Sequence, residues 1–132
     1  MTAVGLVTVR SNHGPQETMS RLEAAVRNKG LTVFAHVDHA AGAAAVGLPL
    51  RATDLLIFGN AKGGTPLMLL DQTMGVNLPL KVLVWQDQWA ATWLSYEDPA
   101  WQAERHGLGK DATPTVSALT GMLRAIVNAA NE

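Results

Sequence analysis

Cysteine is absent from this chain of 132 residues. Its absence excludes thiol catalysis, iron–sulfur clusters and zinc held by cysteine. A chain without disulfides fits a reducing compartment, and we therefore expect a cytoplasmic protein. The length fits one domain, residues 1–132, which buries enough surface to be stable without a disulfide or a structural metal.

An excess of charge of one sign is also lacking. The chain has 10 Lys and Arg against 11 Asp and Glu, a net charge of −1. A nucleic-acid-binding protein normally shows a basic stripe, but the densest basic patch, around Arg21, Arg27 and Lys29, is interrupted by Glu17 and Glu23. Nucleic acid is therefore not an expected partner.

Long apolar runs are missing too. Glycine, proline or a charged residue breaks each run well before the ~20 residues that a membrane span needs. The first residues, MTAVGLVTVR, have no basic leader before their apolar stretch and predict a strand rather than a signal peptide. We expect no membrane partner.

The first half of the chain predicts alternating strands and helices. Strands are expected at residues 3–10, 31–37 and 54–59 because these segments are rich in Val, Leu and Ile. A helix is expected from Pro15 to about Asn28, with Gly30 after it, and Asp38 is placed to cap a short helix that Gly47 ends.

The second half predicts a hairpin between helices. Thr65 is expected to cap a helix that starts at Pro66 and runs to about Gln72. Residues 80–86 and 89–96 predict a hairpin with its turn near Asp87 and Gln88, in a register that the sequence leaves open. Two further helices are expected, one capped by Asp98 from Pro99 to about His106 and one capped by Thr113.

This order of elements indicates the fold class. Strands, a hairpin and several helices in one domain are typical of an α+β protein with a single layer of largely antiparallel sheet and helices packed on one face. No repeat, linker or low-complexity segment indicates a domain boundary.

Four ordered segments resemble the domain-of-unknown-function 302 (DUF302) family. They are FGNAKGGTPLM at 58–68, DHA at 38–40 followed by GL at 47–48, LPLKVLVW at 78–85, and SYEDP at 95–99 followed by RHGL at 105–108. The resemblance runs from about residue 4 to residue 130. Ala61 departs from it, since the family usually has Pro there. The resemblance implies a compact α+β domain with a sheet similar to that of the TATA-binding protein, and a homodimer. It implies no activity.

The glycine-rich segment Asn60–Gly64 is the first candidate site. Backbone N–H groups at a helix start can bind an anion where glycines allow close approach, and Lys62 would add a charge. It is not a Walker A loop, because Thr65 stands where that loop requires Lys. The alternative interpretation is a capped helix after a tight turn.

Histidine is the second candidate. His39 and His106 both lie in the family-like segments, and if they met in space they would form an acid–base pair. With Asp71 they would also form a plausible metal set. The alternative is that both are structural residues at helix ends. His13 and His36 are interpreted as structural or exposed. The sequence assigns no metal site and identifies no cofactor.

The four tryptophans, Trp85, Trp89, Trp93 and Trp101, are the third candidate. If residues 89–96 form a strand, Trp89 and Trp93 share a face. A base-stacking platform would need basic residues between the rings, and only Lys81 is close in sequence. Packing in the core or at a dimer interface is therefore the preferred interpretation.

The leading hypothesis is a homodimeric domain that binds a small polar or anionic ligand. Its polar signature residues fall at the ends of elements, where pockets form. The predicted ligand-binding residues are His39, Asn60, Lys62, Thr65, Tyr96 and His106. Two alternatives are an enzyme that uses His39 and His106 for acid–base or metal chemistry, and a structural homodimer module with the tryptophan hairpin at its interface.

Overall fold

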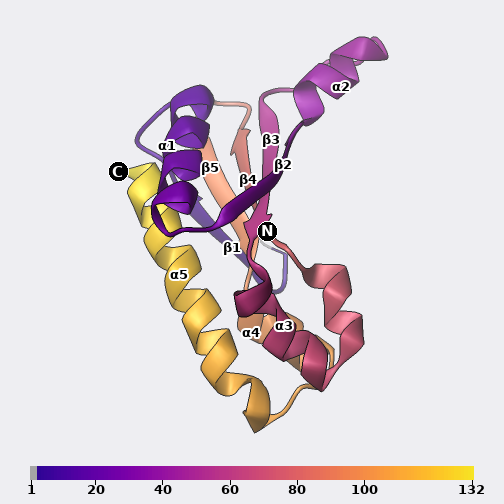
Figure 1. Ribbon diagram of the computed structural model, residues 1–132. Coiled ribbons are helices and arrows are strands. Elements are labelled where there is room, and N and C mark those ends of the chain that lie inside the picture. The colour runs from indigo at the N-terminus through magenta and orange to yellow at the C-terminus, as the bar shows by residue number, and fades with distance from the viewer. Residues whose placement is uncertain (1–2) are drawn as a thin grey trace.

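Five strands form one antiparallel sheet in the computed structural model, which describes residues 3–132 (Figure 1). The strand order across the sheet is β1-β5-β4-β3-β2. The strands are β1 (Leu6–Arg10), β2 (Thr32–Asp38), β3 (Thr53–Gly59), β4 (Leu80–Gln86) and β5 (Thr92–Glu97). The predicted α+β class with an antiparallel sheet is confirmed.

Five α-helices accompany the sheet. They are α1 (Pro15–Asn28), α2 (His39–Ala45), α3 (Ala61–Leu70), α4 (Pro99–Arg105) and α5 (Thr113–Asn131). Two short 3-10 helices, η1 (Gln72–Asn77) and η2 (Lys110–Ala112), were not predicted. Strands β2 to β5 follow one another as neighbours, whereas β1 and β2 lie at opposite edges, so α1 crosses the sheet between them.

One face of the sheet, the covered face, packs against α1 and α5 (Figure 1). Alternate residues of each strand point to this face, as the twofold period of a strand requires. The fully buried side chains include Leu56 and Phe58 of β3, Val82 and Val84 of β4, Leu94 of β5, Leu22 and Val26 of α1, and Ile126 of α5. The hydrophobic core therefore lies between the sheet and two helices.

The other face, the open face, has no such helical layer within residues 3–132 (Figure 1). The intervening residues of the same strands point to this face. Eight of them have apolar side chains. The register places on it Leu6, Thr8, Arg10, Ala35, Val37, Thr53, Leu55, Ile57, Lys81, Leu83, Trp85, Trp93, Ser95 and Glu97.

The tip of the hairpin differs from the predicted one. Its loop has five residues, Trp85 lies opposite Trp93, and Trp89 is 78% exposed in the loop. The reason is Asp87, whose carboxylate accepts hydrogen bonds from the backbone N–H of Trp89 and Ala91 and from Nε1 of Trp93 over 2.9 Å. The prediction that Trp89 and Trp93 share a strand face is wrong, because Trp89 lies outside the strand.

Helix α3 begins at Ala61, five residues before the predicted start at Pro66. The side chain of Asn60, rather than Thr65, caps it by accepting a hydrogen bond from the backbone N–H of Gly63 over 2.7 Å. Pro66 therefore lies inside the helix instead of at its first position. The glycine-rich segment is consequently the first turn of a helix and not a free loop.

Candidate functional site

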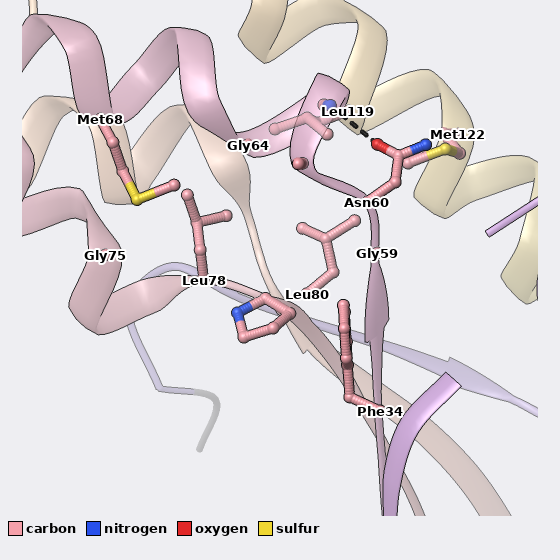
Figure 2. Close-up of a pocket in the computed structure, with 13 residues that line it drawn as sticks. Phe34, Gly59, Asn60, Gly64, Met68, Gly75, Leu78, Leu80, Leu119 and Met122 are labelled. Atoms are coloured by element: carbon pink, nitrogen blue, oxygen red, sulfur yellow. Dashed lines mark hydrogen bonds between the residues drawn. The ribbon is translucent and has the colours of Figure 1, made fainter. Parts of the chain in front are cut away.

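A cavity of about 240 Å³ opens where β3 and β4 meet α3 (Figure 2). Its walls come from β2, α3, η1, the start of β4 and α5. The side chains that line it are Phe34, Asn60, Ala61, Met68, Leu78, Pro79, Leu80, Leu119 and Met122, and four glycines complete the wall. Asn60 is the one polar side chain among these residues, so the cavity is largely apolar.

The glycines allow the backbone to form part of this wall. A Cβ atom on Gly64 would lie 3.2 Å from Cδ1 of Leu78, and one on Gly63 would lie 3.0 Å from Oδ1 of Asn60. Gly59 has a φ of 153°, which side-chain-bearing residues rarely adopt. The motif at 58–68 therefore packs tightly here because its glycines carry no side chain.

Asn60 supplies the hydrogen-bonding group of the cavity. Its Oδ1 atom is held by the backbone N–H of Gly63, and Figure 2 shows its amide nitrogen on the side of Met122. Within residues 3–132, that nitrogen donates to no other protein group. The cap thus fixes the orientation of the side chain and leaves one amide N–H₂ donor at the edge of an apolar cavity.

Phe34 stands at the mouth of the cavity. The pairing of β2 with β3 is irregular between Val33 and Ala35, so Phe34 is the extra residue of a bulge. Its side chain is 56% exposed although it lines the cavity. The bulge turns a bulky aromatic ring toward the opening, and the sequence shows no sign of it.

Lys62 and Thr65 lie next to the cavity rather than in it. Lys62 lines a separate hollow with Pro66 and Thr115, and the two hollows share Gly63 and Leu119. Thr65 is exposed on α3 and is not among the cavity-lining residues. Of the charged and polar residues predicted in the glycine-rich segment, the structure brings only Asn60 into the cavity.

Tyr96 lies in a different hollow. Its side chain is 5% exposed, and with Asn77 and Gln102 it lines a depression of about 560 Å³. Most of the other lining residues belong to the open face, among them Leu83 and Trp85. Burial raises the pKa of the Tyr96 hydroxyl above the ordinary value of 10.0, with Arg124 acting in the opposite direction. The hydroxyl therefore stays protonated well above neutral pH.

His39 and His106 lie at opposite ends of the sheet. His39 begins α2, next to Asp38, which pairs with Asp54 at the start of β3, whereas His106 follows α4 near the other end (Figure 1). The seven residues of β3 span roughly 20 Å between these ends. The antiparallel connection separates the two imidazoles, and the shared hollow that we predicted for the six residues does not form.

His106 is held by a chain of hydrogen bonds. Nδ2 of Asn77 donates to its Nε2 over 2.8 Å, so Nδ1 carries the proton and donates to Oγ1 of Thr73 over 2.8 Å. The Thr73 hydroxyl in turn donates to Asp71 over 2.7 Å. Both ring nitrogens are thus engaged, and His106 ties the end of α4 to η1.

The chain of hydrogen bonds also affects Asp71. Hydrogen bonds from the hydroxyl and the backbone N–H of Thr73, helped by the nearby His106, lower the pKa of this carboxyl below its ordinary value of 3.8. Asp71 also caps η1 through the backbone N–H of Thr73. This geometry agrees with the interpretation of His106 as a structural residue at a helix end. It agrees less well with an acid–base pair of His106 and His39.

The other histidines also contact carboxylates. Nε2 of His36 lies 3.0 Å from Asp54 and its Nδ1 lies 3.4 Å from Glu23, while Nδ1 of His13 lies 3.1 Å from Glu17. In the described part of the chain, no group of three or more His, Asp or Glu side chains is arranged to hold a metal ion.

The fold and the cavity define a class, that of a small α+β domain with one sheet and an apolar pocket at its end. The chain belongs to the family "Domain of unknown function DUF302", which matches residues 7–126. The crystal structure of an uncharacterized conserved DUF302 protein from Bacillus stearothermophilus is similar in fold, with a TM-score of 0.86 at 19% sequence identity. That similarity covers 97% of this chain and 99% of the other.

Curated relatives are longer than this chain. "Fluoride-specific ion channel FluC 1" of Brucella suis biovar 1 (strain 1330) is 45% identical over 115 residues, which are 87% of this chain and 45% of the relative. "Fluoride-specific ion channel FluC 2" of Brucella melitensis biotype 1 is also 45% identical, over 43% of its length. The chain therefore spans less than half of these relatives. Within residues 3–132, no helix combines the length and the apolar character that a bilayer crossing requires.

Proposed function

We propose that this DUF302 domain binds a small, largely apolar molecule with one hydrogen-bond acceptor, in the cavity between α3 and α5. The observation that carries this proposal is the composition of the walls, in which Asn60 is the single polar side chain. The sequence favoured a polar or anionic ligand, but a charged group would lose its hydration against Met68, Leu78 and Met122 with no countercharge in the wall.

The volume supports a ligand with about one ring. An engineered apolar cavity of about 150 Å³ holds benzene, and this cavity is about 240 Å³. A ring with a short substituent fits this space. An acceptor on the substituent would reach the amide N–H₂ of Asn60, which the helix cap holds in place.

Acetophenone and ethylbenzene are matched probes, because they share the ring and differ in the carbonyl oxygen. In titrations of ¹⁵N-labelled protein, we expect both to shift the amide signals of residues 59–64, 75, 78 and 80, and acetophenone to bind more tightly. The variant Asn60→Asp keeps a capping oxygen and removes the donor. It is expected to weaken acetophenone binding about fivefold to tenfold, the value of one hydrogen bond, and to leave ethylbenzene unchanged.

A filled cavity supplies the second test. A Cβ atom on Gly75 would meet only Sδ of Met68, at 3.4 Å, so Gly75→Leu places a side chain in the cavity without a backbone clash. Gly121→Leu is the matched control, because nothing lies within 4 Å of a Cβ atom there and Gly121 does not line the cavity. Binding that survives Gly75→Leu, or an absence of shifts with both probes, would contradict the proposal.

A second candidate function is fluoride binding, which the names of the 45% identical relatives favour. The backbone N–H groups at the start of α3 and Lys62 would be the donors. Sodium fluoride compared with sodium chloride at equal concentration is the test. Amide shifts confined to residues 60–64 in fluoride alone would support it, and identical spectra in the two salts would rule it out.

A further inference from the structure

The hollow lined by Tyr96, called here the Tyr96 hollow, opens on the open face at a gap in the sheet. The pairing of β4 with β5 ends at Leu83 and Ser95, although β4 begins at Leu80 and β5 continues to Glu97. Beyond that pair, β4 stays with β3 and β5 stays with β1. Side chains from the open face and from the helices beneath therefore line one space of about 560 Å³.

The floor of the Tyr96 hollow is polar and deeply buried. Tyr96, Gln102 and Asn77 are 5%, 6% and 7% exposed. The amide nitrogen of Asn77 donates to His106, whereas the Tyr96 hydroxyl and the Gln102 carboxamide have no hydrogen-bond partner within residues 3–132.

These two polar groups face the hollow rather than the packed core. In the described part of the chain, the only fully enclosed side-chain nitrogen or oxygen without a partner is Nε2 of His13. The polar atoms of Tyr96 and Gln102 therefore reach open space, and the hollow that both residues line is that space. Polar groups at this depth are costly unless something bonds to them.

The wall on the open face is apolar and rigid. Nε1 of Trp85 donates to the hydroxyl of Ser95 over 2.9 Å, and its ring stacks on Trp93 with the centroids 6.2 Å apart. Leu55 and Leu83 line the hollow beside it. An aromatic ring fixed in this way favours contact with a flat molecule.

The charged residues that line the hollow oppose each other. Lys81 and Glu97 both belong to the open face, and within residues 3–132 neither forms an ion pair. A ligand with a net charge would be attracted by one of these groups and repelled by the other. The hollow therefore favours a neutral ligand.

From these observations we propose that the Tyr96 hollow is a second ligand site, which takes a flat, neutral molecule of about two rings with a carboxamide or lactam edge. Such an edge offers an N–H donor beside a carbonyl acceptor, and the Gln102 carboxamide and the Tyr96 hydroxyl complement both. The volume of about 560 Å³ lies within the range of roughly 300–1,000 Å³ that is usual for small-molecule sites. Only Leu80 also lines the cavity at α3, so either site can fail without the other.

2-Naphthamide and 2-acetonaphthone are matched probes, because they share the rings and the carbonyl and differ in N–H₂ against methyl. In titrations of methyl-labelled protein, we expect 2-naphthamide to bind about fivefold to tenfold more tightly. It should give intermolecular nuclear Overhauser effects to the methyls of both Leu83 and Leu123. Leu123 lies on α5 and is 1% exposed, so only a probe inside the hollow reaches it.

Gln102→Met tests the polar floor, because it keeps an unbranched side chain and removes both the donor and the acceptor. It should abolish the preference for 2-naphthamide and change the affinity for 2-acetonaphthone less than about twofold. The melting temperature should not fall, since no hydrogen bond within the chain is lost. The control Gln88→Met, in the exposed hairpin loop, should leave the affinities for both probes unchanged.

A filled hollow decides the case even if Gln102→Met fails to fold. Leu83→Trp places a larger side chain in the hollow and should abolish binding, whereas Ile57→Trp lies on the same face outside the hollow and should not. The proposal would be overturned by the absence of binding with both probes, by equal affinities for them, or by binding that survives Leu83→Trp. Effects confined to Leu55 and Leu83 would also overturn it, because the probe would then only adhere to the sheet.

Discussion

The two faces of the sheet are built from alternate residues of the same strands, yet they have different neighbours. Leu56 lies in the core under α1 and α5 and is 0% exposed, whereas the adjacent Leu55 points to the open face and remains half-buried. The register places eight Leu and Val residues of the strands on the covered face and four on the open face, which also carries Arg10, Lys81 and Glu97. The strand residues and the two helices therefore both mark the covered face as the core.

Adjacent leucines provide the largest expected contrast between the faces. Leu56→Ala removes a fully buried side chain and should lower the free energy of unfolding by about 3 kcal/mol. Leu55→Ala should cost the isolated chain less than about 1 kcal/mol, because no helix packs on it. Urea denaturation of both variants under dilute conditions measures the two losses. Equal losses would show that the open face is already packed within one chain.

Ser95 offers an intermediate effect on the open face. Its hydroxyl accepts a hydrogen bond from Nε1 of Trp85 over 2.9 Å and lies 2.9 Å from Oγ1 of Thr8. Ser95→Ala leaves the indole N–H without its acceptor, and we expect a loss of about 1 kcal/mol. The control is Thr8→Val, which breaks only the second contact and should cost less. Thermal unfolding followed by tryptophan fluorescence reports both, and a larger loss in Thr8→Val would be inconsistent with this arrangement.

Asp87 makes the hairpin at the edge of the open face sensitive to pH. The hydrogen bond from the Trp93 indole N–H is the largest effect on the pKa of Asp87 and lowers it below its ordinary value of 3.8. Desolvation, the second-largest effect, raises the pKa, and the backbone N–H groups of Ala91 and Trp89 lower it further. A carboxyl with a lowered pKa in the folded state stabilises the fold above its unfolded pKa, and this contribution is lost as the pH falls through the folded pKa. The stability difference between wild type and Asp87→Asn should therefore be present at neutral pH and shrink in acid below pH ~4. A difference that stays constant across this range would show that the ionised carboxylate is not the stabilising group.

The smallest expected effect lies outside both faces, at the start of α3. Ala61 occupies the first position of this helix, where the family usually has Pro and where Pro is favoured because its N–H is not needed. Ala61→Pro should raise the stability by about 0.5 kcal/mol by restricting the unfolded chain. Calorimetric melting of the variant measures the gain. A clear loss would indicate that the Ala61 N–H has a partner.

Much of the fold follows from short-range patterns in the sequence. The apolar segments at residues 54–59 and 80–86 predict β3 and β4. Asp38 and Asp98 cap α2 and α4, as expected. The five-residue length of the hairpin loop was not predicted. It depends on the hydrogen bonds that the Asp87 carboxylate accepts from Ala91 and Trp93, and these form only in the folded hairpin. The early start of α3 was missed because Pro66 gave a stronger local signal than the Asn60 cap.

The candidate site was predicted less completely. The segments at 58–68 and 78–85 do meet at the cavity, and Asn60 lines it. Phe34 and Met122 were missed because they are apolar and distant in sequence, and only the folded chain brings them there. His39 and His106 were grouped by their chemistry, whereas the sheet topology separates them. The glycines at 59, 63 and 64 were the signal that pointed to close packing at this place.

Contacts between a bound probe and methyl groups of the protein test the central claim most directly. The methyls of Leu78, Leu119 and Met122 mark the cavity, and those of Leu55 and Leu83 mark the open face. We predict that acetophenone gives intermolecular nuclear Overhauser effects to the first set. Effects confined to the second set would mean that the probe adheres to the uncovered sheet, and would contradict a small-molecule site between α3 and α5.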